Sequence, residues 1–108
     1  MFRPGQVVTV FRSRLRPEHR AAYEAYSEEI FAVARTMPGL VDIKDFTAED
    51  GERVAIVTFA DHATQEAWRR HVDHAAAQQR GRDDFYSEYS VQVCDALRVS
   101  VFPPPAEP

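Results

Sequence analysis

Two histidines in the second half of the chain have the residue type and spacing for acid–base chemistry. His71 and His74 lie three residues apart in a segment with helical periodicity, so they project to similar sides of a helix. Histidine titrates near neutral pH, and either side chain could act as a general base. A half-buried histidine bonded to a backbone carbonyl is the structural alternative. No third cysteine or histidine ligand is near, so we predict no metal site.

Other kinds of site are not indicated. The sequence contains no Ser-His-Asp arrangement, no phosphate-cradling glycine loop and no redox cysteine pair. Cys94 is the only cysteine, which excludes an internal disulfide and indicates a reducing compartment. A net charge of −4 gives no basis for nucleic-acid binding. With no signal peptide and no apolar run of about 20 residues, we predict a cytoplasmic protein that does not enter membranes.

Six periodic segments must position any functional residues. Alternating apolar residues predict strands over residues 6–14, 40–47, 53–59 and 89–101. Helical spacing predicts two helices, over residues 18–36 and 61–80. In the second strand the alternation places Leu40 and Ile43 on opposite faces. In the second helix the predicted buried stripe runs through Ala67, Trp68, His71, Val72 and Ala75.

The order of these elements predicts one α+β domain. A β-α-β-β-α-β chain with right-handed crossovers forms a ferredoxin-like, four-stranded antiparallel sheet with both helices on one face. We place this domain at residues 1–102 and a mobile, proline-rich tail at residues 103–108. The strands carry apolar residues on both faces, and a bare apolar face is larger than monomers usually expose. We therefore predict a homodimer that packs sheet against sheet.

The stretch from Trp68 to Cys94 resembles the antibiotic biosynthesis monooxygenase family of dimeric α+β barrels. Members often show a Trp, a His-Pro-x-His step, a Gln, a Gly-Arg pair and a Phe-Tyr pair in this order. Here the step is His71-Val72-Asp73-His74, with Val72 in place of the proline, and the pairs are Gly81-Arg82 and Phe85-Tyr86. The turn at Gly51-Glu52-Arg53 and Phe59 also fit, so the resemblance covers roughly residues 7–98.

This resemblance implies a homodimer with one pocket per subunit, between the helices and the concave side of the sheet. Characterised members oxidise electron-rich aromatic compounds with O2 and use no flavin, metal or haem. The implied function is a cofactor-independent monooxygenase that oxidises an anthrone- or quinol-like metabolite in natural-product biosynthesis. Such a reaction requires the protein to bind the substrate, assist its deprotonation and exclude bulk water.

Six residues could supply this chemistry. Trp68 could stack on a planar substrate, and His74 or His71 could take the proton. Tyr26 and Tyr86 could donate hydrogen bonds to a substrate oxygen, and Arg82 could stabilise a phenolate or enolate. Each has a structural alternative: the two aromatic residues Trp68 and Tyr26 as core, Tyr86 in the dimer interface, and Arg82 in an exposed ion pair.

One departure from the family pattern keeps a second function class open. Well-studied members use an asparagine in the pocket, and this chain contains none. Haem-degrading relatives place an iron-binding histidine where Gln78 falls here, so haem degradation is not expected. The alternatives are a non-catalytic homodimer that binds a small apolar ligand or stabilises partner proteins, and an isomerase or cyclase on the same scaffold. A wholly filled core between helices and sheet would count against catalysis.

Overall fold

A computed structural model of the chain describes residues 1–78 and 84–104. The strands are β1 (Val7–Leu15), β2 (Leu40–Thr47), β3 (Arg53–Phe59) and β4 (Tyr86–Asp95). The helices are α1 (Arg20–Thr36), which follows a 3-10 turn at Pro17–His19, and α2 (His62–Gln78). The order β-α-β-β-α-β and the ferredoxin-like α+β fold predicted from the sequence are confirmed.

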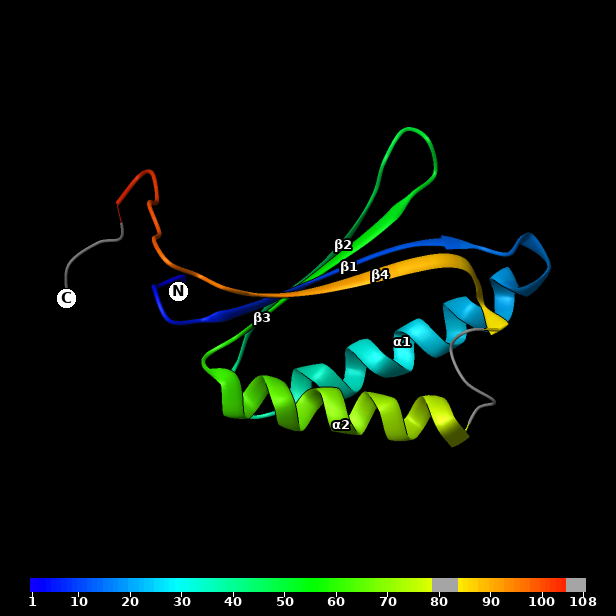
Figure 1. The fold of residues 1–108 in the computed structure, drawn as a ribbon, viewed down its shortest axis with the longest axis horizontal. Coiled ribbons are helices and arrows are strands. Elements are labelled where there is room, and N and C mark those ends of the chain that lie inside the picture. The colour runs from blue at the N-terminus through cyan, green and yellow to red at the C-terminus, as the bar shows by residue number, and fades with distance from the viewer. Residues whose placement is uncertain (79–83, 105–108) are drawn as a thin grey trace.

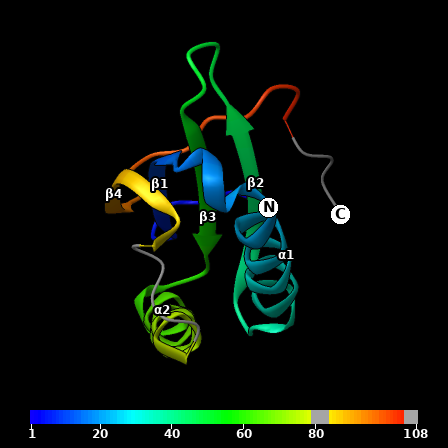
Figure 2. The same ribbon diagram turned by 90° about the vertical axis from the view of Figure 1, so that its right-hand side faces the viewer.

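The four strands form one antiparallel sheet in the order β2-β3-β1-β4. Both helices lie on the same side of this sheet, and no described element covers the other side (Figure 1). Seen along the strands, the two helices run side by side beneath the sheet (Figure 2). On β1, Thr9 is level with Val57 of β3 and Val93 of β4, and these three residues all face the helices.

The junction between the end of α1 and the start of α2 is tightly packed. The chain leaves α1 through Gly39, whose φ of +84° is a left-handed conformation that favours glycine. A Cβ at this position would lie 2.6 Å from Thr64 Cβ in the first turn of α2. Thr64 also takes part in the N-terminal cap of α2, because its backbone N–H donates to Asp61 Oδ1 at 2.9 Å. The cap and the close approach therefore fix where α2 starts.

One prediction about β2 is wrong because the pairing slips by a residue. Leu40 is level with Phe59 and Asp42 with Thr58, so Val41 has no partner of its own on β3. Such a bulge changes the phase of the alternation. Leu40 and Ile43, predicted on opposite faces, consequently both pack against the core.

The last strand is shifted from its predicted bounds of 89–101. It begins at Tyr86, which is level with Leu15, and ends at Asp95, which is level with Val7 at the start of β1. One more pair of backbone hydrogen bonds joins Ala96 to Gln6 and Gly5. Leu97, predicted to lie in this strand, is outside the sheet and exposed.

Two packed clusters lie between the helices and the sheet. The first is built around the fully buried Phe59 and contains Ala34, Val57, Trp68 and Val72. The second contains the buried aromatic residues Tyr26, Phe85 and Tyr86, with Phe11, Leu15, Tyr23 and Ile30 packed against them. A cavity remains between these clusters.

Candidate functional site

The cavity has a volume of about 310 Å³ and lies between the helix-side face of the sheet and both helices. Every strand and both helices contribute to its wall. Its lining residues are Thr9, Phe11, Tyr23, Tyr26, Ser27, Ile30, Phe31, Ile43, Ala55, Val57, Gln65, Trp68, Arg69, Val72, Asp73, Tyr86, Val91 and Val93. A mostly apolar concavity with a few polar groups is the usual form of a small-molecule site, and this volume is near the lower limit of about 300 Å³ for such pockets.

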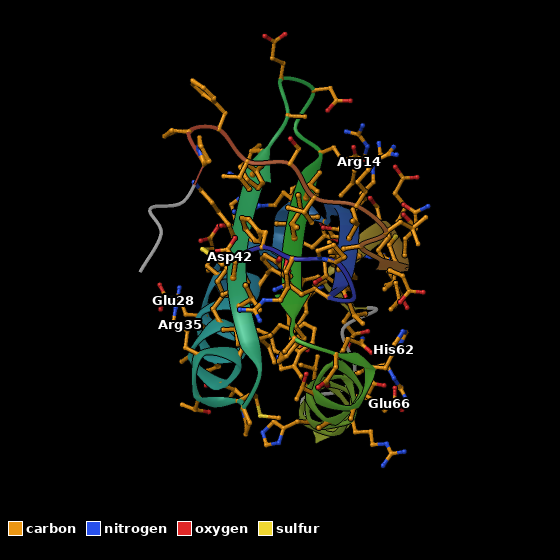
Figure 3. All side chains as sticks on the ribbon, turned by 90° about the vertical axis from the view of Figure 1, so that its left-hand side faces the viewer. Arg14, Glu28, Arg35, Asp42, His62 and Glu66 are labelled. Carbon is orange, nitrogen blue, oxygen red and sulfur yellow. The ribbon has the colours of Figure 1, made fainter. Side chains whose placement is uncertain are left out.

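One stripe of α2 supplies the charged side chains and the amide on the wall. It consists of Gln65, Trp68, Arg69, Val72 and Asp73, which follow the i, i+3, i+4, i+7, i+8 spacing of a single helix face. Other charged residues lie on the outer flanks, where Glu28 and Arg35 of α1 and His62 and Glu66 of α2 point away from the space between the helices (Figure 3). The charged outer flanks leave the inner faces free to line the cavity.

Aromatic rings form the wall opposite the first cluster. Phe11 meets Tyr86 edge-on with ring centroids 5.3 Å apart, and Tyr23 meets Tyr86 in the same way at 5.5 Å. Tyr26 packs on Phe85 at 5.2 Å. Edge-to-face and tilted contacts of this kind hold rings in defined orientations. The wall is consequently a shaped aromatic surface suited to a planar ligand.

Trp68 connects the packed core with the cavity. Its ring lies 5.5 Å from that of Phe59 and is only 9% exposed. Its Nε1–H is buried, and no group in the described part of the chain accepts a hydrogen bond from it. Leaving a buried donor unpaired costs about 1–3 kcal/mol. A ligand oxygen that reached this N–H would recover that free energy.

Arg69 places a lasting positive charge on the cavity wall. Its guanidinium lies 3.0 Å from Glu66 Oε2 through Nε and 2.8 Å from Asp73 Oδ2 through Nη1. The Glu66 carboxylate, helped by Asp73, raises the pKa of Arg69 above its ordinary value, and Arg69 in turn lowers the pKa of Glu66. Arg69 therefore stays protonated at any pH at which the protein would work.

The structure brings together three of the six residues predicted from the sequence. Trp68, Tyr26 and Tyr86 are buried and all line the cavity. His71 is exposed and is not part of the wall. His74 belongs to α2, but its side chain lies outside the described residues, as does the whole of Arg82.

The polar residues of the wall that the sequence did not single out include Thr9, Ser27, Gln65, Arg69 and Asp73. The predicted stripe on α2 included Ala67 and His71, and both are exposed. The true stripe is rotated because the polar residue Gln65 is buried where an apolar residue is the usual choice. The available signal was the i, i+3, i+7 spacing of Gln65, Trp68 and Val72.

Over residues 1–78 and 84–104, no group of three or more histidine, cysteine, aspartate or glutamate side chains is arranged to hold a metal ion. In the same ranges, no helix is long and apolar enough to cross a membrane.

Comparison with known proteins shows the fold. No family model matches the chain. The chain is 26% identical over 99 residues to the uncharacterised protein YqjZ of Bacillus subtilis. The aligned residues make up 92% of this chain and 86% of YqjZ.

Some of the solved structures with this fold carry functional names. A protein of Nitrosomonas europaea, named provisionally as an antibiotic biosynthesis monooxygenase, has a TM-score of 0.71 at 12% identity and covers 95% of this chain and 97% of that one. A mutant of SnoaB, a cofactor-independent oxygenase from Streptomyces nogalater, has a TM-score of 0.70 at 20% identity, with coverage of 93% and 99%. At these low sequence identities, the likeness to both structures shows the fold alone.

Proposed function

We propose that this chain is a cofactor-independent monooxygenase of the antibiotic biosynthesis monooxygenase family that oxidises a reduced, planar aromatic metabolite with O2. The observation that carries the proposal is the aromatic-lined cavity of about 310 Å³ between helices and sheet. Its position is the one that the family resemblance implies for the pocket. The likeness in fold to SnoaB, a cofactor-independent oxygenase, supports the same assignment.

Oxidation of an anthrone by O2 requires few functional groups from the protein. An anthrone loses a proton, its enolate passes electrons to O2, and the resulting hydroperoxide eliminates water to leave a quinone. One oxygen atom of O2 becomes the new carbonyl oxygen, and the other leaves as water with the two hydrogens of the oxidised carbon. The protein must hold the ring system, stabilise the enolate and keep bulk water out.

Residues on the wall can perform these tasks. The rings of Phe11, Tyr23 and Tyr86 hold the planar substrate, and Trp68 Nε1 donates to an oxygen on which negative charge develops. Arg69 lines the same wall, with its guanidinium paired to Glu66 and Asp73. The proposed proton acceptor is the Asp73 carboxylate, which lines the cavity. His74 is the acceptor that the sequence predicts.

A second candidate function is binding of a small apolar ligand without turnover. The observation that favours it is the position of His71, which the sequence offered as a base and which is exposed outside the cavity. The absence of asparagine from the chain points the same way. In this case the same cavity would hold a planar ligand whose oxygen meets Trp68 Nε1.

The test is O2 uptake by metal-free protein with an anthrone substrate. We expect uptake well above the spontaneous rate, and a loss of about tenfold or more in Trp68→Phe, which keeps a ring and removes the N–H donor. His62→Ala, on the outer flank of α2, is the control and keeps the wild-type rate. A comparison of Asp73→Asn with His74→Ala identifies the proton acceptor as the residue whose loss slows uptake.

Uptake equal to that in buffer, together with quenching of Trp68 fluorescence by the same compound, would favour the binding function over the oxygenase. A Trp68→Phe variant with the full wild-type rate would remove Trp68 from the reaction. The first outcome would withdraw the oxygenase, and the second would withdraw only the role of Trp68 as a donor.

We further propose that the protein works as a homodimer joined through the free face of the sheet. That face carries Val8 and Val10 of β1 beside Val54 and Ile56 of β3, with Phe46 of β2 at the edge. Phe46 is 48% exposed, and no helix or strand among the described residues covers this side of the sheet (Figure 1). A second copy would bury these residues sheet against sheet.

Light scattering at micromolar concentration checks the dimer. We expect twice the mass of one chain for the wild type and a single-chain mass for Ile56→Lys, because a buried charge without a partner opposes association. Glu28→Lys, on the outer flank of α1, should leave the dimer intact. A single-chain mass for the wild type would refute the dimer.

A further inference from the structure

The cavity wall contains a buried amide whose presence the fold alone does not explain. Gln65 is only 5% exposed and lies on α2 one turn before Trp68. It faces Thr9 of β1, which is also 5% exposed. The neighbours of Thr9 across the sheet are the apolar residues Val57 and Val93. A polar pair here costs free energy that an apolar pair of similar size would not.

The hydrogen bond between the two residues is too long to account for this placement. Gln65 Nε2 lies 3.5 Å from Thr9 Oγ1, at the outer limit of hydrogen-bond geometry. Within residues 1–78 and 84–104, Thr9 is the one side chain that bonds the Gln65 amide. An amide has two N–H donors and a carbonyl acceptor, so most of its hydrogen-bonding capacity remains for a ligand in the cavity.

Gln65 and Trp68 act on the same side of the cavity. Residues three apart on a helix are neighbours on one face, and both of these residues line the cavity. The buried N–H of Trp68 has no acceptor in the described chain, and the Gln65 amide has one long contact. Two neighbouring donors of this kind suit a ligand that presents two oxygen atoms along one edge.

We propose that Gln65 is a substrate-recognition residue of this cavity, and that it selects planar aromatic compounds carrying two oxygen substituents on the edge that faces α2. Gln65 binds one oxygen while Trp68 Nε1 binds the other, and Thr9 orients the amide. This inference rests on the proposed use of the cavity for an oxygenated aromatic substrate. A site built to hydrogen-bond an oxygen rejects an analogue that lacks it, because the buried amide is then left unpaired.

The experiment uses the fluorescence of Trp68, which is the only tryptophan in the chain. The probes are two quinones that do not react with O2: a dihydroxyanthraquinone with both hydroxyls flanking one carbonyl, and anthraquinone without hydroxyls. Each is titrated into full-length wild-type protein, Gln65→Leu and Thr9→Val. Glu28→Leu is the control, because Glu28 is exposed and points outward from the outer flank of α1, away from both the cavity and the free face of the sheet.

We expect Gln65→Leu to weaken binding of the dihydroxy probe about tenfold and to change anthraquinone binding by about twofold or less. Thr9→Val should weaken binding of the dihydroxy probe less, by about threefold, because Thr9 acts only by orienting the Gln65 amide. Glu28→Leu should bind both probes as the wild type does. The anthraquinone titration also checks folding, since a misfolded variant would lose both probes together.

The inference is overturned if Gln65→Leu binds both probes more weakly to the same extent, or if it binds both as the wild type does. It is also overturned if the dihydroxy probe fails to quench the Trp68 fluorescence of the wild-type protein. These outcomes are independent of turnover, because neither probe consumes O2. Failure of O2 uptake with the predicted probe selectivity intact would refute the proposed oxygenase and leave Gln65 as the recognition residue. Normal uptake with no effect of Gln65→Leu would do the reverse.

Discussion

The space between the helices and the sheet is filled in one region and hollow in the next. Phe59 and Ala34 are fully buried among side chains from β3, α1 and α2. On β4, by contrast, the wall of the cavity includes Val91 and Val93, which remain nearly half exposed. The filled region holds α2 against the sheet, and the hollow region is lined by the hydrogen-bond donors of α2, Gln65 and Trp68. We expect substitutions in the first to change stability and substitutions in the second to change binding and turnover.

The largest expected effect is on the filled region. Phe59→Ala should lower the free energy of unfolding by about 3–5 kcal/mol, because a fully buried ring leaves a cavity that the surroundings cannot close. Val93→Ala, on the cavity wall, should lower it by about 1 kcal/mol or less, because Val93 is 49% exposed. Urea unfolding measures both values. Equal losses would mean that the cavity wall carries as much of the stability as the cluster around Phe59.

The next effect separates backbone strain from close packing at the junction of the helices. Gly39 and Gly51 have nearly the same positive φ, +84° and +91°, but only Gly39 has a neighbour within 4 Å of a built Cβ. Gly51→Ala should cost about 1–2 kcal/mol through strain alone. Gly39→Ala should cost about 1–3 kcal/mol more, because its new methyl group overlaps Thr64.

Thermal unfolding of the two alanine variants side by side checks this difference. A Gly39→Ala, Thr64→Ser double variant, which removes the Thr64 methyl, should recover part of the excess. If the two single variants unfold at the same temperature, the approach of α1 to α2 is looser than the structure indicates, and Thr64 does not fix the start of α2.

The same contrast explains which parts of the molecule could be predicted from the sequence. The strands and helices followed from periods of two and 3.6 residues, because apolar burial dominates in the filled region. Leu40 was misplaced because a bulge leaves no mark in an alternating pattern. The end of the last strand was missed because it depends on where β1 begins, at Val7, and not on the sequence of residues 96–101.

The candidate site was predicted only in part, for a related physical reason. Aromatic residues such as Trp68 and Tyr86 can be recognised from the sequence, because a large ring in a small domain usually lies in a core or a pocket. A buried polar residue such as Gln65 does not, because local propensity gives no reason to bury an amide. The stripe on α2 was therefore predicted through exposed Ala67 and His71 and not through Gln65. Rules of sequence patterning are expected to fail at such sites.

The smallest expected effect concerns the cap that starts α2. Asp61 accepts hydrogen bonds from the backbone N–H and the hydroxyl of Thr64, both at 2.9 Å, and they hold the pKa of its carboxyl below the ordinary value of 3.8. A carboxyl with a lowered folded-state pKa stabilises the fold at neutral pH. That contribution begins to fall as the pH approaches 3.8 and is lost as the pH passes through the lower folded-state value.

Urea unfolding at neutral and acidic pH tests this contribution with two variants of Asp61. Asp61→Ala should be less stable than the wild type at neutral pH, and the difference should shrink below about pH 4, where the wild-type carboxyl also loses its charge. Asp61→Ser keeps an acceptor that does not titrate, so its stability at neutral pH should lie nearer the wild type, with a weaker dependence on acid. A difference between wild type and Asp61→Ala that persists unchanged into acid would mean that the charge of Asp61 is not what caps α2. In that case Thr64 and the approach of Gly39 would be the contacts that set the first turn, and with it the position of Gln65 one residue later.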